Sequence, residues 1–216
     1  MNHGHNFCGV CNKTLELHGK RRRGQIAKWN KTHLLWFIAD RLPGISIETL
    51  TAAYKEAFAS WQAIAGVTFQ QTASQSNADI VLLSRPIDQE SGVLAEAELP
   101  VGDDRQLRMW LDTAESWDQD GNVLQSEIDL VAVIAHEAGH ILGIGHISEG
   151  NLLAPYYDPS IRNPQQGDIA EGLKRYGPPV LVPPDDSEED FSPITVLVEL
   201  PRAVKPGLYT AELKLQ

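Results

Sequence analysis

Residues 136 to 146 read His136-Glu137-Ala138-Gly139-His140-Ile141-Leu142-Gly143-Ile144-Gly145-His146. His136 and His140 are four residues apart, so on an α-helix their side chains lie on one face and can bind the same ion. Gly143 is expected to end that helix, because glycine accepts the left-handed backbone conformation that turns the chain back. His146 then completes a set of three ligands. Three protein ligands leave a fourth position open, which is typical of a catalytic zinc ion and not of a structural one.

Glu137 follows the first histidine directly, and we expect it to lie beside the metal without binding it. A carboxylate at that place can take a proton from a zinc-bound water and act as a general base. The alternative is that surface or core histidines fall into this register by chance. Agreement at five specified positions disfavours it, because each residue type makes up only a small share of an average sequence.

Composition limits the class of protein. The chain has 216 residues, 42% of them hydrophobic, and a formal net charge of −11. The length suits one globular domain with some extra chain, and the negative charge disfavours nucleic acid as a partner. No apolar run approaches the roughly 20 residues that a membrane span needs. Only two cysteines occur, Cys8 and Cys11, so the body of the protein is not stapled by disulfides.

The N-terminus shows no secretory signal, because residues 1–12 lack a continuous apolar stretch. Either the protein is not exported by that route or the chain lacks its true start.

Hydrophobic periodicity predicts strands at 33–39, 67–72, 78–84, 93–97 and 107–112, and a helix at about 49–65. Ser126, with Asp129 three residues later, is predicted to cap the helix that carries His136 and His140. A last helix at about 165–176 is expected to end at Gly177.

The character of the sequence changes after residue 177. Residues 178–193 are rich in proline and acidic side chains and are predicted to form a solvated linker. Residues 194–200 and 208–215 alternate enough to suggest a β-hairpin within 194–216. Two strands alone are marginally stable, so this tail would dock on the main domain, pair with another chain, or be the remnant of a larger module.

With the histidine motif placed on the penultimate helix of a strand-rich domain, residues 28–177 resemble the matrixins, the matrix metalloproteinase branch of the metzincins. Three further segments carry the resemblance: 28–34 is similar to the opening of the family's catalytic domain, 92–97 to its fourth strand, and 151–157 to its Met-turn and the wall behind it. The resemblance implies an α+β fold, with a twisted five-stranded mixed sheet and three helices. It also implies a monomeric, extracellular zinc endopeptidase that acts on proteins or peptides.

The resemblance also assigns substrate contacts. An extended substrate would pair with the strand at 93–97, and the side chain after the scissile bond would enter an adjacent pocket. Leucine at 153 replaces the methionine of the family's turn and would serve as the apolar floor beneath the metal. Alanine at 132 is smaller than the family's usual residue and predicts a roomier pocket. The substrate-binding residues implied are Leu94, Ala95, Ala132, Pro155, Tyr156 and Tyr157.

Two further metal sites of the family can be judged from the sequence. The structural zinc is expected to be absent, because Glu96 and Trp110 stand at histidine positions and the loop before Asp88 is shortened. A calcium site is implied on alignment, since calcium accepts oxygen ligands of mixed origin. The alternative is that these acidic residues are merely solvated. The implied ligands are carboxylates of Asp88, Asp112 and Glu115 and main-chain oxygens of Gln89, Ser91 and Val93.

Residues 8–12, Cys-Gly-Val-Cys-Asn, resemble the cysteine switch with which matrixin pro-segments block the zinc. Phe7, Cys11 and Asn12 depart from the family's pattern. In this interpretation residues 1–27 form a pro-segment, and the basic run 20–23 is its processing site or simply a solvated loop. Two alternatives stay open for Cys8: a small zinc knuckle with His3, His5 and Cys11, or a redox pair with Cys11.

A rival from another functional class is a non-catalytic, zinc-stabilised module that binds peptides along its strand edge. Glu137 would have no task in such a module, which favours the peptidase.

Overall fold

The computed structural model describes residues 26–88, 92–118 and 127–179. The predictions for Cys8, Gln89 and Ser91, and the hairpin predicted within 194–216, lie outside the described residues. The regular elements in chain order are β1 His33–Ile38, α2 Ile47–Gln62, β2 Thr68–Gln71, a 3₁₀ turn Gln75–Asn77, β3 Ile80–Arg85, β4 Ala95–Ala97, β5 Leu107–Asp112, β6 Trp117–Asp118, β7 Ile128–Asp129, α3 Leu130–Ile141 and α4 Gln166–Tyr176.

The main sheet has five strands in the order β2-β1-β3-β5-β4. The first four are parallel to their neighbours, whereas β4 runs antiparallel to β5, with Ala95 opposite Leu111. Together with three α-helices in the described part of the chain, this confirms the predicted α+β fold with a mixed sheet. β4 is shorter than the predicted 93–97, although the carbonyl of Leu94 still accepts a hydrogen bond from Asp112.

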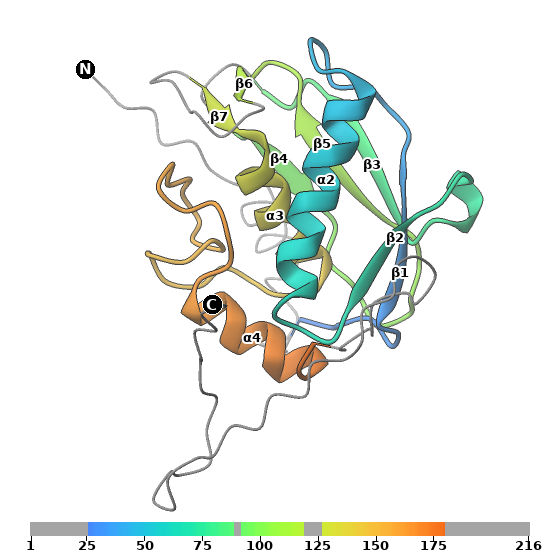
Figure 1. Ribbon diagram of the computed structural model, residues 1–216, viewed down its shortest axis with the longest axis vertical. Helices are drawn as coiled ribbons and strands as arrows, with labels where there is room; N and C mark the ends of the chain where they lie inside the picture. The colour runs from blue at the N-terminus through green and yellow to red at the C-terminus, as the bar shows by residue number, and fades with distance from the viewer. Residues whose placement is uncertain (1–25, 89–91, 119–126, 180–216) are drawn as a thin grey trace, which may run out of the picture. The chain divides into compact units, whose positions relative to one another are not determined.

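Helix α2 crosses the sheet and lies beside α3 (Figure 1). It begins two residues before its predicted start because the Ser46 side chain caps it by accepting the Thr49 N–H. It ends at Gln62, before the predicted 65. The indole of Trp61 donates to the carbonyl of Ala135, which joins the two helices in the core. The predicted apolar stripe within α2 is buried: Leu50, Ala53, Tyr54, Ala57, Phe58 and Trp61.

The prediction that Ser126 caps the helix that carries His136 and His140 is wrong. Asp129 itself is the N-cap of α3, because its carboxylate accepts the N–H groups of Val131 and Ala132. A carboxylate there satisfies free donors and faces the positive end of the helix dipole. Ser126 lies outside the described residues. The short parallel pair β6–β7 was not predicted, since two-residue strands carry no alternation.

Helix α4 begins after Gln165, within one residue of its prediction. Asp168 and Gln165 form a reciprocal capping box at its start. Gly177 ends it with φ of +72°, as the sequence predicts for a terminal glycine. The helix thereby returns the chain to the first strand region, where the Tyr176 hydroxyl accepts the N–H of Trp29.

Candidate metal centre and substrate pocket

The three motif histidines converge. His136 and His140 project from α3, and Gly143 turns the chain after the helix with φ of +83°, so that His146 returns to them. Their ring centroids lie 4.8, 4.9 and 5.4 Å apart. Gly143 has a second reason to be glycine, since a Cβ there would lie 2.1 Å from the carbonyl oxygen of Ala27. The predicted arrangement of the motif is therefore present.

The hydrogen bonds of two histidines define their tautomers. His136 Nδ1 lies 2.7 Å from the Leu152 carbonyl oxygen, and His140 Nδ1 lies 2.8 Å from that of Ile144. A carbonyl only accepts, so both Nδ1 atoms donate, and in the neutral rings both Nε2 atoms carry bare lone pairs. These two Nε2 atoms face each other at 3.1 Å. Facing lone pairs at this distance call for a cation between them.

Zinc fits this donor set. Two nitrogens bound to one tetrahedral zinc ion are separated by about 3.3 Å, from Zn–N bonds of about 2.05 Å. The observed 3.1 Å agrees with that value. The Nδ1–carbonyl hydrogen bonds are the outer contacts that orient histidine ligands of zinc.

Burial keeps the histidines neutral. Desolvation lowers the pKa of His136 to about 4 and that of His140 well below its usual range, and nearby His146 adds to both shifts. Desolvation also lowers the pKa of His146. Only neutral imidazole binds a metal, so the centre is ready to bind at neutral pH without losing protons.

Leu153, which the family resemblance assigns to the floor of the site, packs against the helix that carries His136 and His140. It is fully buried, and a Cβ added at Gly139 would lie 2.7 and 2.8 Å from its two Cδ atoms. The turn that holds Leu153 is bound by Asp168, whose carboxylate accepts the N–H groups of Leu152 and Leu153. Sequence reasoning missed Asp168. Its position in the first turn of α4 indicated a cap but not this second task.

A pocket opens beside His136 and Glu137. Glu137 lines the pocket and is only 1% exposed. Of the predicted substrate residues, all but Ala95 line the pocket; Ala95 is fully buried in the core. The role predicted for Ala95 is a main-chain contact with the substrate. A side chain that is buried in the core does not test that contact. Besides His136 and Glu137, the pocket is lined by Leu94, Ala132, Val133, Asn151, Leu152, Pro155, Tyr156, Tyr157, Asp158 and Ile161.

The acidic residues predicted to bind calcium also gather. Asp88, Asp112 and Glu115 each place one carboxylate oxygen within 4.8 Å of the others. Asp112 is buried and accepts the N–H groups of Ile87 and Asp88. Val93 contacts this group through its N–H, which donates to Asp88 at 3.0 and 3.1 Å. Its predicted carbonyl contact stays a prediction.

At the positions expected to have lost a structural zinc, charged and aromatic side chains interact directly. Arg85 forms an ion pair with Glu96 at 2.5 Å, and its guanidinium lies 4.9 Å from the ring centroid of Trp110. Glu96 and Trp110 are paired across β4 and β5. These contacts join the last strand, β4, to its neighbour β5 and to β3 beyond it.

A five-stranded mixed sheet backed by a helix with two histidines, a glycine turn and a third histidine defines the metzincin class. The family model for matrixins matches residues 28–177, and the chain belongs to the matrixin family. No helix in the described part of the chain is long and apolar enough to cross a membrane.

Three known proteins illustrate the relationship. The chain is similar to karilysin from Tannerella forsythia, with 31% identity over 80% of this chain and 38% of that protein. It is 30% identical to metalloendoproteinase 1-MMP from Arabidopsis thaliana, over 70% of this chain and 45% of the relative. Identity to human matrix metalloproteinase-16 is 29%, over 82% of this chain and 33% of the relative. The chain thus spans less than half the length of each.

Proposed function

We propose that this protein is a zinc-dependent endopeptidase. The observation that carries the proposal is the pair of bare Nε2 atoms of His136 and His140, 3.1 Å apart, beside a pocket that His136 and Glu137 line. His146 supplies the third ligand. Bound zinc supplies Lewis-acid activation of water and of a peptide carbonyl.

The chain's own residues perform the rest of the reaction. The Glu137 carboxylate takes the proton of the attacking water and later passes it to the leaving amine, which frees the new N-terminus. Its burial excludes bulk water from this transfer. The Nδ1 hydrogen bonds of His136 and His140 hold both rings in one tautomer throughout.

Substrate recognition follows from the sheet and the pocket. β4 is the last strand in the order of the described sheet, and an extended peptide is proposed to pair with it as one more strand. The side chain after the scissile bond enters the pocket between Ala132, Pro155 and Tyr157. The apolar lining favours an apolar side chain there.

Glu137→Ala tests the mechanism. In a Cys8→Ala background, which removes the proposed latency, the variant should bind one zinc ion as tightly as the protein with Glu137 and lose peptide turnover by about 10²-fold or more, the usual contribution of a general base. Equal turnover by a zinc-loaded variant would show that Glu137 has no such role. If the Cys8→Ala protein binds zinc and peptides but never cleaves the peptides, the chain is the non-catalytic peptide-binding module instead.

The acidic group of Asp88, Asp112 and Glu115 is proposed to bind calcium. Three carboxylates this close repel one another, and a cation relieves that repulsion. Calcium should raise the melting temperature of the parent, and Asp88→Asn should reduce that increase. An unchanged melting temperature with calcium contradicts the assignment.

Latency is the part of the proposal that concerns residues 1–27. The thiolate of Cys8 would occupy the open position at the metal, and removal of the first 23 or so residues would activate the enzyme. Cys8→Ala should then be active without processing, whereas the parent should not.

Four further expectations stay predictions: a linker at 178–193, a hairpin at 194–216, a monomeric state and an extracellular location.

A further inference from the structure

Arg162 follows the pocket residue Ile161 and forms ion pairs with two helices. Its Nη1 donates to the Asp129 carboxylate at the start of α3. Its Nε and Nη2 donate to one carboxylate oxygen of Glu56 on α2, at 3.2 and 3.0 Å. These three residues, Glu56, Asp129 and Arg162, are named the Arg162 clamp. The clamp joins a loop to the two helices that form the core of the domain.

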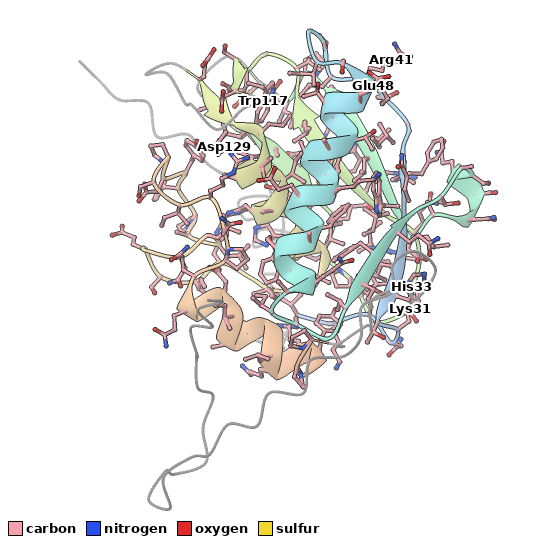
Figure 2. The ribbon with its side chains drawn as sticks, in the orientation of Figure 1. Lys31, His33, Arg41, Glu48, Trp117 and Asp129 are labelled. Atoms are coloured by element: carbon pink, nitrogen blue, oxygen red, sulfur yellow. The ribbon has the colours of Figure 1, made fainter. Side chains whose placement is uncertain are left out.

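Asp129 is the centre of the clamp. It is 4% exposed, and Figure 2 shows it at the N-terminal end of α3. One carboxylate oxygen accepts the N–H groups of Val131 and Ala132, while the other accepts Arg162. Its own N–H donates to the Tyr157 hydroxyl at 3.0 Å. The same residue therefore binds the helix and both ends of the loop 157–162.

The clamp contacts residues that line the pocket or are next to lining residues in the chain. Ala132 lines it from α3, whereas Tyr157 and Ile161 line it from the loop. Ala132 and Tyr157 each bind Asp129, and Ile161 is bonded to Arg162 in the chain. The ion pair between Asp129 and Arg162 thus connects the two walls of the pocket, α3 and the loop 157–162. Because Asp129 is buried, this pair is poorly screened and is costly to break.

We propose that Arg162 is a positioning residue that sets the specificity of the pocket. By binding Asp129 it holds the loop 157–162 against α3, and so limits the size of the side chain accepted after the scissile bond. The proposal rests on the proposed peptidase function and adds to it the residue that determines selectivity. A single methylene in an apolar pocket changes selectivity by about 10- to 200-fold, so a loop held less firmly should measurably reduce discrimination.

Two substitutions remove the ion pair between Asp129 and Arg162 in different ways. Arg162→Met keeps the length of the side chain and removes its charge. Asp129→Asn keeps one oxygen to cap α3 but turns an amide group toward Arg162, so the ion pair is lost while the cap remains. If Arg162→Met does not fold, Asp129→Asn still tests the proposal. Arg162→Lys retains the charge, and Lys174→Met removes an exposed ion pair with Glu171 on α4 as a matched control.

The experiment measures kcat/KM on peptides that differ only after the scissile bond, with alanine, leucine, phenylalanine or tryptophan there. All proteins are full-length, zinc-loaded and carry Cys8→Ala, because the parent is proposed to be latent. Arg162→Met and Asp129→Asn should reduce the ratio between the best and worst peptide by about tenfold or more. Arg162→Lys should restore part of the ratio, and Lys174→Met should leave it unchanged. A purely structural role would lower kcat/KM equally for all four peptides, and that result would overturn the proposal.

Hydrogen exchange of the metal-free protein gives a readout that does not depend on activity. Amides of the loop 157–162 and of Asp129 should exchange faster in both variants, while amides of α4 should not change. If the exchange rates in the loop do not change, the clamp does not hold the loop against α3, whatever the activity of the variants. If the Cys8→Ala protein with the clamp intact cleaves none of the peptides, the proposed function is overturned, and with it the specificity role. Faster exchange in the loop would then confirm only the clamp.

Discussion

The buried carboxylate of Asp168 accepts the N–H of Leu153 at 3.0 Å, so the first turn of α4 holds the residue that is proposed to lie beneath the metal. The same carboxylate accepts Leu152 at 2.8 Å and Gln165 at 2.7 Å. The carbonyl of Leu152 in turn accepts His136 Nδ1. A single acidic side chain on α4 is thus connected through one residue to a metal ligand on α3.

Asp168→Ala is expected to lower the free energy of unfolding by about 3 kcal/mol, because it leaves several buried N–H groups without their acceptor. It should also weaken zinc binding by about tenfold, as loss of an outer contact to a ligand does. Urea unfolding and a competition assay with a zinc chelator measure the two effects. Glu171→Ala, at a more exposed site on the same helix, is the control. A change in stability no larger than that of the control would contradict this role.

Gly139→Ala should destabilise the protein by about 1–3 kcal/mol through overpacking, since the new Cβ would lie within 2.8 Å of both Cδ atoms of Leu153 and of the Trp61 ring. Leu153→Val, which removes those Cδ positions, should recover part of the loss in the double variant. Thermal unfolding of the four proteins of this cycle gives the coupling energy. Strictly additive effects would show that Leu153 is not what excludes a side chain at residue 139.

The convergence of the three histidines was predictable because the motif is local. Helical spacing alone brings His136 and His140 to one face, and Gly143 needs only its own backbone conformation to return His146. Strand β5 was likewise predicted over its full length, since it is a central strand with an uninterrupted ladder. Local patterns sufficed wherever neighbours in sequence determine the geometry.

The missed features depend on distant residues. Asp129, the cap of α3, also forms an ion pair with Arg162, 33 residues away, which no spacing rule indicates. β4 begins late because the N–H of Val93 donates to the Asp88 side chain and is withdrawn from the strand ladder. The Asp168 contacts and the Arg162 clamp join segments that come together only in the folded chain.

The metal-free protein should lose stability as the pH falls from about 6.5 to about 4. Histidine in the unfolded chain has a pKa of about 6.5, whereas burial lowers the pKa of His136 in the folded chain to about 4. Between these values the unfolded state binds more protons, so acid favours unfolding, and above the upper value the effect vanishes. Melting temperatures with a chelator should therefore fall through this window, and His136→Gln should show a shallower fall. A pH-independent melting temperature would contradict the burial of these rings.

Arg85 is expected to hold the substrate-binding edge strand in the place of a second zinc ion. β4 pairs with β5 through only three registered residues, and the Arg85–Glu96 ion pair and the Trp110 contact supplement them. Arg85→Met should cost about 1 kcal/mol or less, because Arg85 is partly exposed, but should raise KM with little change in kcat. Arg108→Met, which removes a more exposed 3.9 Å ion pair with Glu98, should change neither constant. Metal analysis should give one zinc ion per chain in parent and variant alike, and two ions in the parent would contradict this account of the strand.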